Sequence, residues 1–439
     1  MPRYRLGICA LLLSLAGHAS ATEQPPMLHI AGSNTLGAQL MPALVSEMLQ
    51  QEGFTGIRTQ RDLTAPLQQR VTATQGAHAQ YVSIVSEGSG TGFVALSSDP
   101  NVIAASSRPI KAAEASDLQH LGDLTQAQYE HVIALDGLAI IVHPDNPVRA
   151  LNTEQLAQIY AGKITHWHEL GGGSSAIQVH ARDDQSGTYD TFKELVLSPN
   201  KLELGSRVLR YASNSDLRDA VLDDPAAIGF VSLSALGKAR ALAIADGDAQ
   251  PMEPSQLALA TEDYPLTRRL FLYSAAPNKP WTKRLLEFAH SPNGQAVVER
   301  TGFVPQRIEA VTIAPQPDMP VAYRELASEA QRLTVNFRFL PGSAELDNKA
   351  KLDIQRAADW LKQQGKDDNK AVLVGFGDAH MEPSRARLIS KLRAMAVRRE
   401  LSRAGVFLLE VDGLGDALPV ASQQGSGRTK NQRVEIWVR

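Results

Sequence analysis

The sequence predicts an α/β protein built of two folded domains, a larger one followed by a smaller α+β domain. Three observations indicate this: 439 residues with 43% hydrophobic content, a repeated strand–loop–helix pattern in the first part, and a proline-rich stretch before the last quarter. The length suits two or three domains. The apolar content is sufficient for buried cores, so the chain is not expected to be disordered.

Residues 1–21 are predicted to be a signal peptide. Two arginines precede an apolar run from Leu6 to Ala16, and Ala19-Ser20-Ala21 provides the small residues of a cleavage site. Cleavage before Thr22 would remove Cys9, the only cysteine, so the exported chain is expected to have no disulfide. No other apolar run is long enough to span a bilayer, and no transmembrane segment is expected after cleavage.

A linker is predicted at residues 313–322. Three prolines between Pro315 and Pro320 cannot continue a helix or a central strand, and they favour a semi-rigid extended segment. The linker separates a first domain, residues 22–312, from a second, residues 323–439. The net charge is −10 over residues 22–322 and +5 over residues 323–439. Because no long run of Lys or Arg occurs, nucleic-acid binding is not expected.

The first domain repeats one kind of corner three times, a β-rich run that ends in small and hydroxyl residues before a helical segment. The three runs and their corners are Leu28–Ala31 with Gly32–Thr35, Tyr81–Val85 with Ser86–Gly92, and Ile177–His180 with Arg182–Thr188. Ser and Thr cap the first amides of a helix, and Gly lets the backbone approach a ligand. Since a helix N-terminus attracts anions, three such corners and Arg182 are typical of an oxyanion site. The alternative is that each corner is an ordinary helix cap.

These corners resemble those of the phosphate-binding proteins of bacterial phosphate ABC importers, a branch of the periplasmic-binding-protein superfamily. The resemblance covers residues 28–312. Its matching stretches are Gly32–Leu36, Gly88–Gly92, Ala105–Pro109, Ile159–Thr165 with Trp167, Arg182–Thr188 and Ala227–Ser232. The resemblance implies the type II fold, with two α/β lobes joined by crossover strands and the anion in the cleft between them.

Carried over position by position, the resemblance implies a set of phosphate-binding residues. They are Thr35, Leu36 (through its amide), Ser89, Ser107, Arg182, Asp184, Ser186, Gly187 (through its amide) and Thr188. Asp184 is implied to orient Arg182. Ser107 stands where the best-known branch has an Asp that accepts a proton from monohydrogen phosphate and repels sulfate. Selectivity for phosphate over sulfate or arsenate is therefore left open.

The second domain is predicted to have the order β-α-β-α-β-β. The predicted elements include a strand over Leu333–Phe339, a helix over Leu346–Leu361 with Leu352 among its inward residues, and a buried strand over Ala371–Gly375. A longer helix over Ser384–Ala404 follows, with Leu388, Leu392, Met395 and Leu401 as its apolar positions.

Asp378 and Arg393 stand at the junction between that buried strand and the longer helix. Together they suit a zwitterion, because Asp378 takes an ammonium and Arg393 a carboxylate. The alternative is a surface ion pair of little energetic worth.

The second domain resembles the OmpA-like peptidoglycan-binding domain over about 115 residues. The resemblance is carried by Phe339–Leu346, Gly375–Asp378, Ile389–Ala394 and Asn431–Ile436. It implies binding of the diaminopimelate of the cell-wall peptide by Asp378 and Arg393. Three positions depart from the family pattern, where Phe376, Gly377 and Ala386 replace its His, Thr and Asn.

Together the two domains predict a periplasmic protein that binds phosphate or a similar oxyanion and is anchored to peptidoglycan on the outer-membrane side of a Gram-negative envelope. An ABC importer permease is a further expected partner. No catalysis, cofactor or metal is expected; His166 and His168 lack a third ligand nearby in the sequence. The alternative is a ligand-free adhesion or structural module tethered to the wall.

Overall fold

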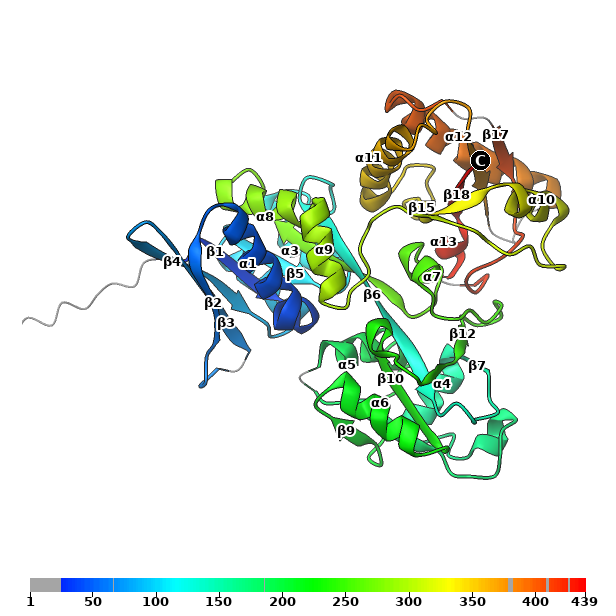
Figure 1. The fold of residues 1–439 in the computed structure, drawn as a ribbon, viewed down its shortest axis with the longest axis horizontal. Coiled ribbons are helices and arrows are strands. Elements are labelled where there is room, and N and C mark those ends of the chain that lie inside the picture. The colour runs from blue at the N-terminus through cyan, green and yellow to red at the C-terminus, as the bar shows by residue number, and fades with distance from the viewer. Residues whose placement is uncertain (1–24, 66, 185, 378–381, 408–409, 425–426) are drawn as a thin grey trace, which may run out of the picture.

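A computed structural model describes residues 25–65, 67–184, 186–377, 382–407, 410–424 and 427–439. The predicted signal peptide and its cleavage site lie outside these residues. Figure 1 shows two lobes of the first domain, joined by strand β6, with the second domain beside them. Within the described ranges, no helix combines the length and apolarity that a membrane crossing requires.

The first lobe is a twisted sheet with helices on both faces. Parallel strands β4, β1 and β5 form its centre, and β2 and β3 extend it as an antiparallel hairpin. The strands are β1 (Leu28–Gly32), β2 (Thr55–Arg61), β3 (Gln68–Gln75), β4 (His78–Val85) and β5 (Val102–Ser106). The helices are the π-helix η1 (Leu36–Leu40), α1 (Met41–Gln51), α2 (Ser89–Ser98), α3 (Ala112–Asp117), the short η2 (Gln119–Leu121), α8 (Pro280–His290) and α9 (Pro292–Arg300).

The second lobe continues the same sheet through β10, β8 and β9. Its strands are β8 (Gln178–Arg182), β9 (Leu209–Tyr211), β10 (Ala227–Ser232) and the short β11 (Arg240–Ala241), with β7 (Ala150–Asn152) and β12 (Ala243–Ala245) paired separately. Its helices are α4 (Thr153–Tyr160), η3 (Trp167–Leu170), α5 (Gly187–Phe192), η4 (Lys193–Leu197), α6 (Asn214–Asp223), η5 (Leu233–Ala235) and α7 (Gln256–Ala260).

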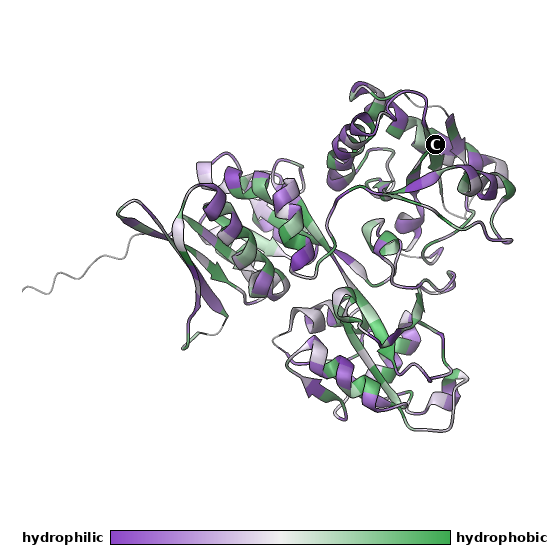
Figure 2. Cartoon of the chain, in the orientation of Figure 1, coloured by the Kyte–Doolittle hydropathy of each residue, from purple (hydrophilic) through white to green (hydrophobic). Residues whose placement is uncertain are grey.

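Two crossover strands join the lobes. Strand β6 (Glu130–Val142) pairs with β13 (Thr267–Ser274) along its first half and with β10 along its second half. Its residues from Val132 to Val142 are all buried, because the strand is covered on both faces as it passes between the lobes. Figure 2 shows β6 and β10 as mostly hydrophobic, whereas hydrophobic and hydrophilic residues alternate along the outer helices. The two-lobed fold with crossover strands is confirmed.

The second domain has a five-stranded sheet in the order β14-β15-β18-β16-β17. The predicted β-α-β-α-β-β order is present in β15 (Gln331–Arg338), α11 (Asn348–Gln363), β16 (Ala371–Gly375), α12 (Pro383–Arg403), β17 (Glu410–Gly413) and β18 (Arg433–Val438), with three further elements, β14 (Ala310–Val311), α10 (Val321–Glu329) and α13 (Gly427–Asn431). Strand β14 pairs with β15, so the sheet of the second domain begins a few residues before the expected linker.

Most of the apolar positions expected in the long helix face solvent. Leu401 is buried, but Leu388 is 58%, Leu392 52% and Met395 39% exposed. Helix α12 instead packs through a mixed face of small, polar and branched apolar residues, namely Ala386, Ser390, Arg393, Ala394, Val397 and Leu401. The reason is close packing, since a Cβ added at Gly375 of β16 would lie 1.9 Å from the carbonyl oxygen of Ser390. On α11, Leu352 is also exposed, and its prediction as an inward residue was wrong.

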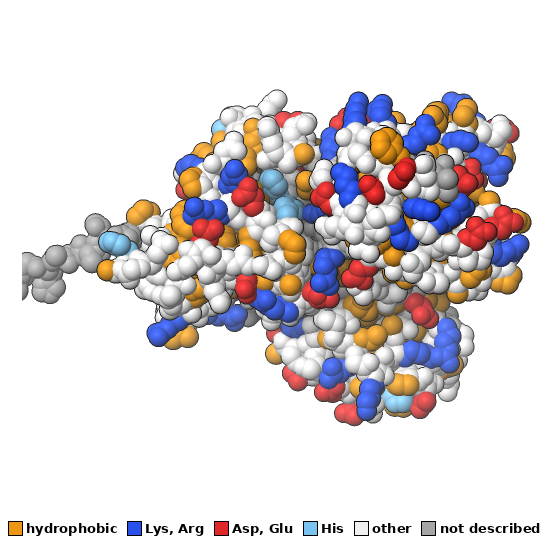
Figure 3. Space-filling view, turned by 45° about the horizontal axis from the view of Figure 1, so that its top comes forward, with side chains coloured by type: hydrophobic (Ala, Val, Ile, Leu, Met, Phe, Trp, Pro, Cys, Tyr) orange, Lys and Arg blue, Asp and Glu red, His pale blue; other side chains and the backbone are white. Residues whose placement is uncertain are grey.

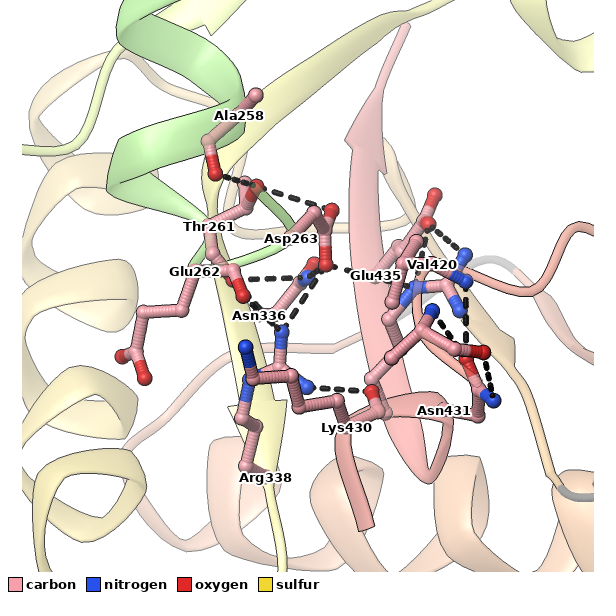
Figure 4. A network of polar contacts seen from close by, with 12 residues as sticks. Ala258, Thr261, Glu262, Asp263, Asn336, Arg338, Val420, Lys430, Asn431 and Glu435 are labelled. Atoms are coloured by element: carbon pink, nitrogen blue, oxygen red, sulfur yellow. Dashed lines mark hydrogen bonds and ion pairs between the residues drawn. The ribbon is translucent and has the colours of Figure 1, made fainter. Parts of the chain in front are cut away.

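A buried polar network joins the two domains (Figure 4). Asp263, in the loop before β13, accepts hydrogen bonds from Arg332 at 2.8 Å and from Asn336 at 2.8 Å, and it pairs with Arg338 at 3.0 Å. Beside it, Arg269 bridges Glu262 of the first domain and Asp347 of the second, each at 2.8 Å. The second domain therefore packs directly behind a crossover strand of the first.

Candidate functional site

A polar cavity of about 150 Å³ lies between the two lobes. Its walls come from η1, the crossover strand β6, the ends of β8 and β10, the starts of α5 and α6, and the segment after α9. The lining residues are Thr35, Ala38, Gln39, Asp136, Arg182, Ser186, Gly187, Thr188, Asn214, Ser232, Thr301, Gly302 and Phe303. Five of the nine residues implied by the resemblance meet here: Thr35, Arg182, Ser186, Gly187 and Thr188.

Among the described residues that line this cavity, Arg182 is the cation. Its guanidinium donates hydrogen bonds to the carbonyl oxygens of Tyr211 at 3.2 Å and Ala212 at 2.8 Å, and to the side-chain oxygen of Asn214 at 2.8 Å. No carboxylate among the described residues forms an ion pair with it. Burial lowers the pKa of Arg182 although the charges of Asp183 and Asp216 act in the opposite direction. Neutral acceptors thus orient a partly desolvated cation whose charge an anion in the cavity would balance.

The loop after β8 contributes the hydroxyl donors of the second lobe. Ser186 caps α5, where its side-chain oxygen accepts a hydrogen bond from the amide of Tyr189 at 3.4 Å. In this bond the serine oxygen is the acceptor, so its own O–H can donate into the cavity. Thr188 lies in the first turn of α5, which continues into η4 up to Leu197. Ser186 and Thr188 of this loop and helix start therefore line the polar cavity.

The lobes touch where Thr35 meets Gly187. The Thr35 hydroxyl donates to the Gly187 carbonyl at 3.2 Å. A Cβ added at Gly187 would lie 2.5 Å from the Cα of Thr35, which is too close for any side chain. Glycine is therefore required here because two backbones from opposite lobes approach each other.

Sequence reasoning missed two charged residues of the crossover strands, Asp136 and Arg268. Arg268 is 5% exposed and pairs with Asp136 through its Nε at 3.2 Å and with Glu194 through its Nη1 at 2.6 Å. Its Nη2 also donates to the Thr35 hydroxyl at 2.6 Å. Asp136 accepts a further bond from Thr191 at 2.7 Å and lines the cavity. A signal existed, since each is a charge within an otherwise strand-like, largely apolar run.

Ser89 and Ser107 lie beside this cluster and are not in the cavity lining. Their hydroxyl oxygens are 3.2 Å apart, and the Ser107 hydroxyl donates to Glu194 at 3.4 Å. Leu36 is likewise absent from the lining, and its side chain is fully buried. Hydrogen bonds connect the two serines to Glu194, and Glu194 in turn pairs with Arg268.

The implied role of Asp184 in orienting Arg182 is wrong. Asp184 is exposed, and its carboxylate pairs with Arg210 at 2.6 Å. The physical reason is strand geometry, because Arg182 ends β8 and turns toward the Tyr211–Asn214 segment, whereas Asp184 is two residues further along the turn. Asn214 holds Arg182 in the place expected for Asp184.

Asp190 adds a titratable group in the first turn of α5. Burial raises the pKa of Asp190 to about 6, against the lowering effect of Arg268. With Asp136 and Glu194, three carboxyl groups and one arginine gather beside the cavity. The candidate site therefore combines Arg182, which has no ion-pair partner among the described residues, with a cluster around Arg268 in which acidic groups outnumber the cation.

In the second domain, Arg393 lies at the predicted strand–helix junction. Its Nη1 donates to the carbonyl oxygen of Phe376 at 3.5 Å, and its guanidinium is 5.9 Å from the centre of the Phe339 ring. Asp378 lies outside the described residues. Phe376, at the position of the family His, is fully buried in a cluster with Tyr323 and Trp437. Ala386, at the position of the family Asn, is also buried.

Comparison with known proteins agrees with this architecture. Residues 43–293 match the PBP superfamily domain, and residues 338–433 match the OmpA family. The chain is 30% identical over 227 residues to the phosphate-binding protein PstS of Bacillus subtilis, which covers 51% of this chain and 71% of that protein. It is 31% identical over 251 residues to the protein SphX of Synechococcus elongatus, covering 54% and 72%.

A solved structure supports the fold. The possible phosphate-binding protein of Planctomyces limnophilus aligns with a TM-score of 0.52 and 22% identity, over 69% of this chain and 96% of that one. The chain belongs to the PBP superfamily, among the homologues of the PstS phosphate-binding proteins, and carries a C-terminal domain of the OmpA family.

Proposed function

We propose that this protein binds phosphate in the cleft between its two lobes and is held to peptidoglycan by its C-terminal domain. The observation that carries the first part is Arg182, a half-buried cation at the cavity whose hydrogen-bond partners are all neutral. The similarity to PstS proteins supports phosphate as the anion. We place the protein in the periplasm, as a binding protein rather than an enzyme, with an importer permease as the receiver of its cargo.

Phosphate suits the cavity better than sulfate because of Asp136. A buried carboxylate in the lining repels a fully ionised anion, whereas it accepts a hydrogen bond from an anion that still carries a proton. Ser107 has no charge with which to exclude sulfate. We therefore assign the discrimination to Asp136 on β6 and the attraction to Arg182, Ser186 and Thr188.

Substitution of Arg182 by alanine tests the site directly. Loss of this cation should cost on the order of 2–5 kcal/mol, or roughly 30-fold to several-thousand-fold in Kd. Calorimetric titration with phosphate measures the loss, and circular dichroism checks the fold. Arg218→Ala is the matched control, because Arg218 is in the same lobe, pairs with Asp219 and does not line the cavity. Unchanged phosphate binding in Arg182→Ala would refute the proposed site.

For the wall-binding part, we propose that Arg393 takes the carboxylate of diaminopimelate and Asp378 its ammonium. The position of Arg393 beside Phe376 and Gly377, at the end of β16, supports this. Asp378→Ala and Arg393→Ala should each reduce retention on isolated peptidoglycan, and the double variant should lose less than the sum because both groups bind one ligand. Equal retention of wild type and all three variants would contradict the proposal.

A further inference from the structure

Helix α12 presents a solvent-exposed apolar row that the fold does not use. Leu388, Leu392 and Met395 are 58%, 52% and 39% exposed. At 100° per residue they fall within an arc of about 60° on the helix surface. Buried residues such as Ala394 and Val397 occupy the opposite side. The described part of the domain therefore does not bury this apolar row in its core.

Positive charge surrounds this row. Helix α12 contains seven Lys or Arg residues and one acidic residue, Glu400. By the same helical spacing, Arg385 and Arg403 lie on one side of the row, and Lys391 and Arg398 lie on the other. We call the exposed apolar row and these four cations the α12 face.

Most of these cations are not neutralised by the protein. Arg403 and the neighbouring Arg399 pair with Glu400, at 2.9 and 3.1 Å. Among the described residues, Arg385, Lys391 and Arg398 form no ion pair. Figure 3 shows blue and orange side chains next to one another over the second domain. A strongly positive, partly apolar surface of this kind favours an anionic partner.

We propose that the α12 face binds the surface of an anionic phospholipid bilayer. Three apolar side chains in a row can enter the boundary between headgroups and acyl chains, while long Lys and Arg side chains on both sides reach the phosphates. The hollow around Leu392, Met395 and Ala396 is shallow, which suits a lipid surface better than the insertion of a partner's side chain. A second copy of the same face is disfavoured, because two such faces would repel each other.

This contact is independent of the phosphate site and of Arg393. Arg393 belongs to the buried side of the same helix, so a domain bound to the wall and a domain on a membrane use different sides of α12. The contact would bring the phosphate-binding lobes close to a membrane without a transmembrane segment.

Co-sedimentation of the chain from Thr22 with phosphatidylglycerol-containing vesicles tests the proposal. We expect binding that weakens with salt, and much weaker binding to pure phosphatidylcholine vesicles. Leu388→Ser with Leu392→Ser should lower the partition coefficient at least about tenfold, because the buried apolar area is lost. Lys391→Gln with Arg398→Gln should lower it and reduce the salt dependence.

Matched controls remove exposed apolar or cationic side chains outside helix α12. Val94→Ser with Leu209→Ser removes two apolar residues that are 69% and 51% exposed, and Arg58→Gln with Arg61→Gln removes two exposed cations of β2. Both controls should bind vesicles like wild type, and all variants should retain phosphate affinity. Absence of wild-type binding to phosphatidylglycerol would overturn the proposal, as would equal losses in the controls. A change in sedimentation-velocity mass in the α12 variants would point to self-association instead and would also overturn it.

Discussion

At the scale of single residues, two arginines at the cleft have different roles because their partners differ. Arg268 is almost fully buried and forms ion pairs with Asp136 and Glu194. Arg182 is held by two carbonyls and an amide oxygen, all neutral. In a buried ion pair with good geometry, each charge already has a partner that offsets its desolvation. A cation held only by neutral dipoles is stabilised further when an anion binds beside it. Of the two, Arg182 is the residue suited to bind an anionic ligand.

Asp136→Asn should weaken the discrimination between phosphate and sulfate. The amide keeps an oxygen that can accept from Thr191, but it no longer carries the charge that repels a fully ionised anion. We expect the ratio of the two Kd values to fall by at least about tenfold, mainly through tighter sulfate binding. Competition calorimetry with both anions measures the ratio. If the ratio is unchanged, Asp136 is not the discriminating group.

At the scale of elements, the sequence predicts where strands end and which corners face the cleft. The corner after β8 is placed as expected, because a strand that runs into Arg182–Thr188 puts a hydroxyl cap at the start of α5. Asp136 and Arg268 were not predicted, since each lies inside a strand, where the pattern indicates core, whereas the predicted ligands lie in loops. Asp184 was misassigned, because the residues that orient Arg182 are about 30 positions further along the chain, in another strand–helix corner.

Gly187→Ala should weaken phosphate binding without unfolding either lobe. The new Cβ would meet the Cα of Thr35 in the opposite lobe, and a backbone atom cannot move aside by changing rotamer. The position itself is helical, so alanine is tolerated within α5. We expect at least about tenfold weaker binding, because the lobes cannot approach fully.

Small-angle scattering checks the Gly187→Ala prediction structurally. With phosphate present, the variant should remain more open than wild type, while its melting temperature without phosphate stays close to that of wild type. Wild-type affinity in Gly187→Ala would show that the contact between Thr35 and Gly187 is not needed for binding.

At the scale of the whole molecule, the second domain is packed against the back of a crossover strand. Adjacent residues of β13 point to opposite faces, so Arg268 reaches the cleft and Arg269 reaches the second domain. Sequence analysis predicted both domains and the βαβαββ order. It did not predict their interface, because that interface depends on pairs such as Asp263 and Arg332 that lie far apart in the chain and in separate domains.

This interface should make stability depend on acid pH. Burial alone would raise the pKa of Glu262, but Arg269, Lys349 and Arg338 outweigh it and lower the pKa to about 2. The folded protein therefore binds the proton more weakly than the unfolded chain. The contribution of Glu262 is complete above its unfolded pKa of about 4.5 and is lost as pH falls toward 2.

Glu262→Gln tests this pH dependence. The variant should be less stable than wild type at pH 7, by on the order of 1–3 kcal/mol, and the difference should shrink as pH falls from 5 to 2. Thermal or urea unfolding over this pH range measures it. Glu309→Gln, at an exposed acid outside the network, is the control. A difference that stays constant with pH would mean that folding does not shift the pKa of Glu262.

Native mass spectrometry of protein purified without added phosphate tests the central claim most directly. Wild type should retain the mass of one phosphate, and Arg182→Ala should not, because Arg182 is the cation in the cavity lining that has no ion-pair partner among the described residues. The retained ion should be phosphate even when sulfate is present in excess during purification. Wild-type protein that carries no anion and gains none on addition of phosphate would contradict the account.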